Sequence, residues 1–219
     1  LGDVYKRQGL FSTHKFEGTP SVNNPHPQKG FLYNGAKNPD LDRFFLSPSH
    51  YALTLYAALI ETKRLNDKSL KEFNKDGSVL DMIGSEHSPG HETNGGSFGQ
   101  TISQAAGVAW ARRRKKEKGL VWLFLSDGEF QEGQTWEALM SMAFHKISNL
   151  KIVVDVNGQQ VDGKTCDVMN LEPLLEKISS FGACVKQVDG HDLVALNNAF
   201  RTVHQDKPLV VLAKTSPFR

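Results

Sequence analysis

The residues best suited to chemistry are an aspartate and an asparagine that each follow an apolar run. Asp127 comes after the run 120–125, and Asn157 comes after the run 151–156, thirty positions later. Carboxylate and amide oxygens suit Mg²⁺, which takes one or two carboxylates together with phosphate oxygens of a ligand. If the two runs are neighbouring strands, both side chains emerge at one edge of a sheet. The pair therefore predicts a magnesium site, against the simpler alternative of a capping Asp and an Asn-Gly turn.

A third candidate is the glycine-rich stretch 94–100, which reads Asn-Gly-Gly-Ser-Phe-Gly-Gln. Free N–H groups at a helix start, with no Cβ atoms in the way, form a site for phosphate. The stretch is neither a P-loop, because no lysine follows in register, nor a GxGxxG fingerprint. It predicts an anion site, and a plain flexible loop remains the alternative.

The elements that must position these loops alternate between short apolar runs and amphipathic segments. Regular structure is expected from Ser47-Pro48, a helix-start signal, with Ala52 and Leu55 on the buried face. Further helices are expected over 97–116, 132–147, 171–180 and 192–204, with Trp110 and Met140 among the inward residues. The expected strands cover 120–125, 151–156, 183–188 and 209–213. This alternation predicts an α/β fold, a doubly wound, mostly parallel sheet with helices on both faces.

The length of 219 residues favours one large domain. Residues 1–42 read as a loop-rich lead-in, rich in Pro, Asn, Gly and His, and residues 1–8 fit no later pattern and look extraneous. Residues 43–219 are expected to form the folded domain.

Composition excludes several classes of protein. Lys and Arg number 26 against 24 Asp and Glu, so the net charge of +2 gives no strong field for nucleic acid or anionic lipid. The two cysteines make no disulfide framework and suit a reducing compartment. No apolar run is long enough to span a bilayer, and no signal peptide opens the chain. A cytoplasmic protein without a membrane or nucleic-acid partner is therefore expected.

Five segments together resemble a known family. They are 42–50, 92–100, 126–138, 155–163 and 188–192. Their spacing, above all from Asp127-Gly128 to Asn157, is similar to the amino-terminal, diphosphate-binding domain of transketolases, especially the kind split into two subunits. The resemblance extends over most of 38–215 and implies the thiamine-diphosphate-binding fold.

The resemblance also implies a cofactor, thiamine diphosphate with Mg²⁺, and residues that hold it. Asp127, Asn157 and the backbone carbonyl of Gln159 correspond to the metal ligands. Gly128 corresponds to a glycine against the diphosphate. The backbone of Gly96, Ser97 and Phe98 corresponds to a segment that contacts the cofactor.

Three further residues match catalytic positions of the family. His50 corresponds to a histidine near the diphosphate, and His87 to an active-site histidine before the glycine-rich loop. Glu132 corresponds to a glutamate that links two active sites across a dimer.

The sequence also departs from the family pattern. No Gly-His pair followed by Gly-Gly-Ser occurs in 9–40, and the later substrate-side histidine would lie beyond Arg219. The family's cofactor-activating glutamate belongs to a separate pyrimidine domain, for which 219 residues leave no room. The resemblance therefore implies an amino-terminal subunit or a fragment that carries half of a site. It would be active with a pyrimidine-domain subunit, in a homodimer or heterotetramer, for two-carbon ketol transfer between sugar phosphates.

The sequence leaves other functions open. The chain could be a non-catalytic scaffold or dimerisation module on the same fold. It could also belong to another thiamine-dependent enzyme, a deoxy-sugar phosphate synthase or a 2-oxoacid decarboxylase. A zinc site at His87 and His91 is disfavoured, because Pro89-Gly90 between them breaks any shared helix face. The basic run 112–118 is expected to be a solvated helix end.

Overall fold

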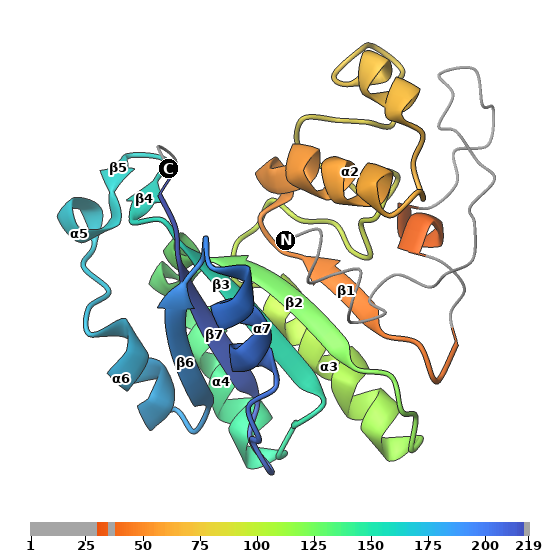
Figure 1. Cartoon of the computed structure of the whole chain (residues 1–219). Coiled ribbons are helices and arrows are strands. Elements are labelled where there is room, and N and C mark those ends of the chain that lie inside the picture. Colours follow the sequence, from red (N-terminus) through yellow and green to blue (C-terminus); the bar gives the residue numbers. More distant parts are fainter. Residues whose placement is uncertain (1–29, 35–37, 217–219) are drawn as a thin grey trace.

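The fold is built on a five-stranded, wholly parallel sheet (Figure 1). The computed structural model describes residues 30–34 and 38–216. In the sheet the strands lie in the order β1-β2-β3-β7-β6. Their bounds are β1 (Arg43–Leu46), β2 (Val121–Ser126), β3 (Leu150–Val156), β6 (Cys184–Asp189) and β7 (Leu209–Lys214).

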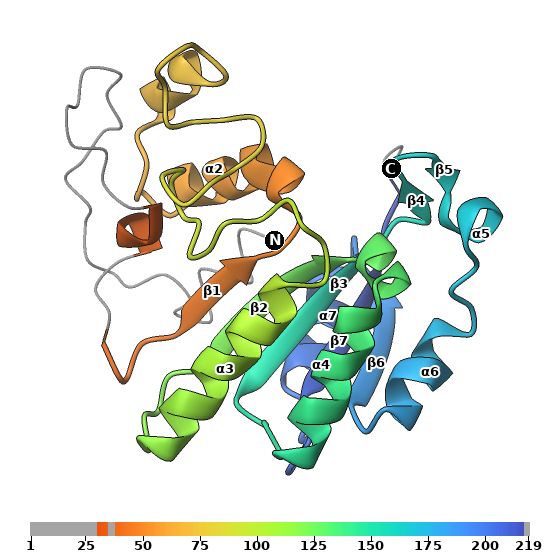
Figure 2. The ribbon, with the colours of Figure 1, turned by 180° about the vertical axis from the view of Figure 1, so that it is seen from behind.

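Helices cover both faces of this sheet, which confirms the predicted fold class (Figures 1 and 2). One face carries α2 (Ala52–Glu61) and α7 (Leu193–Phe200). The other face carries α3 (Thr101–Arg114), α4 (Gly133–Phe144) and α6 (Leu174–Ser180). The short elements are η1 (Gly30–Asn34), η2 (Ser49–Tyr51), η3 (Asp67–Glu72), η4 (Asp127–Gln131), β4 (Gln159–Gln160), β5 (Gly163–Lys164) and α5 (Thr165–Val168).

Alternation along the strands divides the apolar residues into two cores. In β2, Trp122 and Phe124 pack with the helices α2 and α7, whereas Val121, Leu123 and Leu125 pack with α3, α4 and α6. Side chains of successive strand residues point to opposite faces, so a strand covered on both faces reads as one continuous apolar run. This is why the runs 120–125 and 151–156 predicted buried strands correctly.

The edge strand β1 and the start of the first helix differ from the prediction. β1 precedes Ser47, where regular structure was expected to begin, and pairs in parallel with β2. Ser47 caps no helix, because its hydroxyl donates a hydrogen bond to the Glu129 carboxylate. The chain instead forms the 3-10 turn η2 before α2 begins at Ala52. Four residues are too few to give a strand a periodic signal, so only pairing with β2 defines it.

Two predicted core residues lie at the surface. Trp110 in α3 is 43% exposed and Met140 in α4 is 52% exposed, while Met142 is fully buried. The helix α3 also begins at Thr101 and not at Ser97. The backbone explains that later start, since Gly96 and Gly99 have φ of +100° and +79°, in the left-handed region that a right-handed helix excludes.

The basic run is not wholly a solvated helix end. Arg112 is only 4% exposed, and its Nη2 donates to the backbone carbonyls of Pro39 (2.9 Å) and Leu41 (2.7 Å). It thereby fastens the chain before β1 to α3. The rest of the run keeps its charges at the surface or half-buried.

Two other parts of the fold bear on the predictions. The hairpin β4–β5 and the helix α5 were not predicted, and they follow directly after the Asn157 loop. Residues 1–29 of the predicted lead-in lie outside the described residues, and the boundary at residue 42 stays a prediction. Among the described residues, no helix is both long and apolar enough to cross a lipid bilayer.

A buried carboxylate, that of Glu129, fastens together the segments that carry the site. Glu129 has no exposed surface. It accepts hydrogen bonds from the hydroxyl of Ser47 after β1, from the N–H of Ser126 at the end of β2 (3.0 Å), and from the N–H of Gly99 in the glycine-rich loop (3.4 Å). Burial raises the pKa of Glu129, and these three donors oppose that rise.

A second buried ionisable residue, His91, belongs to the core. Its side chain is 1% exposed and its ring lies edge-on to Tyr56, with 6.4 Å between the ring centroids. Burial lowers the pKa of His91 to about 4. His87 is exposed instead and lies 3.4 Å from a Glu86 carboxylate oxygen. The two histidines therefore do not converge, and the described residues contain no cluster of three or more His, Cys, Asp or Glu.

We predict that Glu129→Ala destabilises the fold by about 2–4 kcal/mol, because it leaves buried donors of Ser47, Ser126 and Gly99 without an acceptor. Urea denaturation of the wild type and of the Glu129→Ala variant measures this loss of stability. The matched control is Glu137→Ala on the exposed face of α4, which should change stability by less than about 0.5 kcal/mol. Equal losses of stability in the two variants would contradict the proposed role of Glu129 in holding these segments together.

We also predict that His91 makes stability depend on pH. Its folded-state pKa of about 4 lies below its unfolded value near 6.5, so the unfolded chain binds the extra proton first. The stability that the neutral His91 contributes is complete above the pKa of the unfolded chain. It is lost as the pH falls toward the pKa of the folded state. Between about pH 7.5 and 4.5, the wild type should lose about 2–3 kcal/mol more than His91→Leu. Denaturant titrations at both pH values test this, and parallel losses in the two proteins would refute it.

Candidate active site at the carboxyl edge of the sheet

The candidate site lies where β1, β2 and β3 end. The chain after β1 leads to α2 on one face, and the chain after β2 leads to α4 on the other. Such a divergence opens a crevice at the carboxyl ends of parallel strands, which is where open α/β sheets bind ligands. The register pairs Ser126 of β2 with Asp155 of β3. The residues that follow each strand are therefore brought to the same edge.

Asp127 lies at the centre of this edge and is 2% exposed. Its Oδ1 accepts a hydrogen bond from the N–H of Gly128 (2.9 Å), and its Oδ2 accepts one from the N–H of Gly158 (3.0 Å). The Thr165 hydroxyl lies 3.4 Å from the same Oδ2. Burial raises the pKa of Asp127, the backbone donors oppose that rise, and the nearby Asp155 adds to it.

Asn157 follows β3 and has its side-chain amide held on both sides. Its Nδ2 donates to the Tyr51 hydroxyl (2.9 Å) and to Oδ2 of Asp155 (3.0 Å). Its Oδ1 accepts the N–H of Gln159 (2.8 Å). Gly158, between Asn157 and Gln159, is the residue that reaches Asp127. The two loops that were expected to converge thus meet directly.

Asn157 belongs to a polar network that includes Tyr51, Asp155 and Thr215. The Tyr51 hydroxyl donates to Oδ2 of Asp155 at 2.8 Å, and the Thr215 hydroxyl donates to Oδ1 of the same carboxylate. Burial, reinforced by the charge of Asp155, raises the pKa of Tyr51 well above its ordinary value. The phenol is therefore protonated and serves as a donor at any physiological pH.

The glycine-rich loop approaches the end of β1 closely. A Cβ atom added at Gly95 would lie 2.7 Å from Cβ of Ser49 and 2.9 Å from the carbonyl oxygen of Ser47. Gly96 and Ser97, beyond it, are exposed. They lie in turns before α3 and not in its first turn, and this corrects the expectation of a helix N-terminus there.

His50 belongs to the same edge. Its ring centroid is 5.8 Å from that of Phe98 and 4.7 Å from that of Tyr51. The residue is exposed, but desolvation by these neighbours lowers the pKa of His50. The structure thus brings His50 beside Phe98 of the glycine-rich loop, and its place near a diphosphate stays a prediction.

The donor set fits a small divalent cation. Oδ1 of Asp127 and Oδ1 of Asn157 each accept one backbone N–H, and an oxygen with two lone pairs then has one left for a metal. All of these ligand atoms are hard oxygens, as Mg²⁺ prefers. A cation would also offset the cost of burying the Asp127 charge. One carboxylate with amide and carbonyl oxygens leaves coordination positions for phosphate.

Gly128, unlike Gly95, is not required by close packing within the protein. A Cβ atom added there would meet only Cβ of Gln160, at 3.6 Å, which is an ordinary contact. The fold itself therefore has room for a side chain at this position. Close approach of a ligand is the remaining physical reason for a residue without one.

The remaining predicted residues lie around this centre. Glu132 is exposed at the start of α4, and its Cβ lies 3.0 Å from the position that a Cβ on Gly99 would take. His87 is exposed in the segment between η3 and the glycine-rich loop. The catalytic roles of Glu132, His87 and His50 stay predictions.

Four residues of the site were not predicted from the sequence. They are Tyr51, Asp155, Thr165 and Thr215. Asp155 alone carried a signal, since it is an acidic residue near the end of an apolar strand. The other three are ordinary helix or loop residues whose partners lie far away in the sequence.

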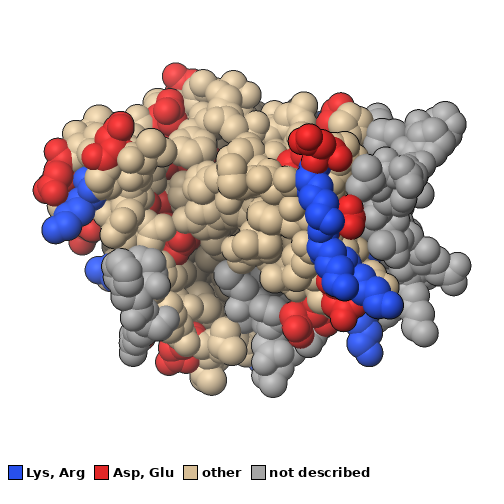
Figure 3. Space-filling view, turned by 90° about the horizontal axis from the view of Figure 1, so that it is seen from above, with Lys and Arg blue, Asp and Glu red and all other residues tan. Residues whose placement is uncertain are grey.

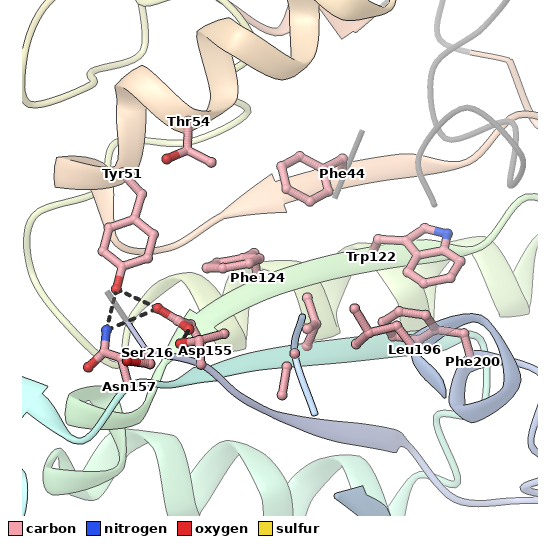
Figure 4. A pocket seen from close by; sticks show the side chains of 14 residues that line it. Phe44, Tyr51, Thr54, Trp122, Phe124, Asp155, Asn157, Leu196, Phe200 and Ser216 are labelled. Atoms are coloured by element: carbon pink, nitrogen blue, oxygen red, sulfur yellow. Dashed lines mark hydrogen bonds between the residues drawn. The ribbon is translucent and has the colours of Figure 1, made fainter. Parts of the chain in front are cut away.

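An apolar cavity of about 360 Å³ opens beside Tyr51, on the face between α2 and α7 (Figure 4). Aromatic side chains, Phe44, Trp122 and Phe124, form its floor. Its polar end is the cluster of Tyr51 with the Asp155 and Asn157 side chains. The site and the cavity thus share one polar wall.

Seen from above, toward the carboxyl edge, the middle of the molecule is mostly free of charged side chains (Figure 3). Lys, Arg, Asp and Glu gather toward its margins. A line of Lys and Arg side chains runs along one side of this face, with Asp and Glu side chains beside it (Figure 3).

Comparison with known proteins supports the geometry. The chain is 43% identical over 178 residues to an uncharacterised transketolase family protein from Sinorhizobium fredii, covering 80% of this chain and 64% of that protein. It is 32% identical over 181 residues to one of the subunits of an apulose-4-phosphate transketolase from Actinobacillus succinogenes, covering 82% and 66%. The crystal structure of Campylobacter jejuni transketolase superposes with a TM-score of 0.72 at 26% identity, covering 82% of this chain and 30% of that one.

The chain spans about two-thirds of the length of these curated relatives. Residues 31–216 match the family described as "Transketolase, thiamine diphosphate binding domain". Because that match extends over most of the chain, the chain belongs to the thiamine diphosphate-binding domain family of transketolases.

Proposed function

We propose that this chain is the diphosphate- and Mg²⁺-binding subunit of a two-chain transketolase that transfers a two-carbon ketol unit between sugar phosphates. The observation that carries the proposal is the contact between the loops after β2 and β3, where the N–H of Gly158 donates to Asp127 at 3.0 Å. Membership in the thiamine diphosphate-binding family supports the cofactor.

The residues of the site have distinct parts in holding the cofactor. Mg²⁺ would bind the Asp127 carboxylate, Oδ1 of Asn157 and the backbone carbonyl of Gln159. Its charge would offset that of the diphosphate. Gly128 would let the diphosphate approach the backbone, which agrees with the room that the fold leaves there.

The glycine-rich loop and His50 would hold the other side of the diphosphate. The backbone of Gly96, Ser97 and Phe98 would contact the cofactor, and His50 lies next to Phe98. Because desolvation lowers the pKa of His50, its imidazole is neutral near pH 7 and can donate one hydrogen bond to a phosphate oxygen.

When bound, thiamine diphosphate supplies a nucleophilic carbon, C2 of its thiazolium ring. This chain would contribute the anchor, the orientation of the diphosphate and a dry sheet edge. Activation of the aminopyrimidine ring would come from a pyrimidine domain, which we propose is carried by a second polypeptide. The Actinobacillus relative is named as one of the subunits of its transketolase, which supports such a partner.

The assembly would contain at least two copies of the chain. Glu132 is exposed beside the glycine-rich loop, so a second subunit could reach it without unfolding α4. This agrees with the proposed link between two active sites in a homodimer or heterotetramer. His87, exposed before the same loop, would face the substrate side.

We predict that Asp127→Ala abolishes the Mg²⁺ dependence of thiamine diphosphate binding and weakens binding by at least about 100-fold, because it removes a metal ligand. Isothermal titration calorimetry with and without Mg²⁺ measures both effects. Asp162→Ala, which removes an exposed carboxylate from the β4–β5 turn, is the matched control and should bind like the wild type. Equal affinities of the Asp127→Ala variant and the wild type would reject the metal site.

Activity is tested separately, with a pyrimidine-domain polypeptide added and two-carbon transfer between ketose and aldose phosphates followed by mass spectrometry. Transfer that requires both chains, Mg²⁺ and the cofactor is expected. Tight cofactor binding without any transfer would favour the scaffold alternative, and turnover of 2-oxoacids instead would favour a decarboxylase.

A further inference from the structure

We propose that Tyr51 is a positioning residue for the cation, because its hydroxyl fixes the side-chain amide of Asn157 so that the amide oxygen faces the metal. The inference rests on the proposed function, since it concerns the same metal site. It adds a residue for which neither the sequence motifs nor the family description provides a role.

A closed triangle of hydrogen bonds lies at the end of β3 (Figure 4). The Tyr51 hydroxyl donates to Oδ2 of Asp155 at 2.8 Å and accepts from Nδ2 of Asn157 at 2.9 Å. Nδ2 of Asn157 also donates to Oδ2 of Asp155 at 3.0 Å. Each of the three side chains thus contacts the other two.

This triangle determines the orientation of the Asn157 amide. If the amide were turned over, its oxygen would face the Asp155 carboxylate and its NH₂ group would face the N–H of Gln159. Both contacts would be repulsive, since the first pairs two acceptors and the second pairs two donors. In the observed orientation Oδ1 accepts the Gln159 N–H and keeps a lone pair for a cation.

Tyr51 is itself held rigidly. It ends the 3-10 turn η2, and its ring packs against Phe124 at 5.8 Å and against His50 at 4.7 Å between centroids. Asp155, the other partner of Asn157, is held from its far side by the Thr215 hydroxyl. Groups outside the ligand shell that fix a ligand in this manner raise metal affinity by reducing the freedom that binding must remove.

Tyr51→Phe tests the inference, because it removes only the hydroxyl and leaves the ring in place. Asn157 keeps its bond to Asp155 but loses one of two acceptors. We predict that the Mg²⁺ concentration needed for half-maximal thiamine diphosphate binding rises about tenfold. At saturating Mg²⁺ the affinity for thiamine diphosphate should return to within about twofold of the wild type, since the variant impairs only metal binding.

Tyr56→Phe is the matched control. Tyr56 lies on α2 directly after η2, and its hydroxyl donates to the carbonyl oxygen of Asp81 at 3.0 Å, outside the triangle. The same chemical change there should leave the Mg²⁺ requirement within about twofold of the wild type. Calorimetry at a series of Mg²⁺ concentrations gives this requirement, and thermal unfolding of both variants reports any general loss of structure.

Each outcome has one meaning. A Mg²⁺ requirement of Tyr51→Phe equal to that of the wild type overturns the inference and leaves the proposed function intact. Weak thiamine diphosphate binding that saturating Mg²⁺ does not restore also overturns it, because Tyr51 would then be purely structural. A wild-type protein that binds thiamine diphosphate without any Mg²⁺ dependence overturns both the inference and the metal site of the proposed function.

Discussion

The hydrogen bond from the backbone of Gly158 to the Asp127 carboxylate is the contact on which the site depends. It joins the loops after β2 and β3, and it exists only because these strands pair in parallel with Ser126 opposite Asp155. A shift of one residue in that register would turn the side chains of one strand to the wrong face and misalign the loops. The two apolar cores stabilise this register, because alternate strand residues are buried in the core on one face or the other.

The buried carboxylates of Asp127 and Glu129 lie two residues apart in the sequence and differ in how they are compensated. Glu129 receives three hydrogen bonds from three segments and so fixes the shape of the site. Asp127 accepts backbone N–H groups on both oxygens, and its Oδ1 keeps one lone pair that no donor among the described residues uses. Burial raises the pKa of both groups. For Glu129 the protein's own donors offset this cost, whereas for Asp127 the proposed cation would complete the compensation.

Each face of the sheet has a pocket beside its helices. The face between α2 and α7 contains the apolar cavity of about 360 Å³, and a smaller pocket of about 210 Å³ lies between α3 and α4 on the other face. Tyr51 lines the larger cavity and its hydroxyl contacts Asp155 and Asn157, so it connects that cavity to the carboxyl edge of the sheet. The exposed Glu132 and the sparsely charged top face fit the proposed half-site, which another subunit would complete.

The sequence by itself determined the fold class and four of the five strands, and it singled out Asp127 and Asn157 as candidates for one site. Buried parallel strands are continuous apolar runs, and polar residues that follow neighbouring strands must meet at one edge, so Asp127 and Asn157 could be paired without coordinates. Only the tertiary structure decided the short edge strand β1, the late start of α3 and the part played by Tyr51. Tyr51 and Asp155 are 104 positions apart, and no local pattern encodes a contact that exists only after the chain has packed both segments against the same sheet.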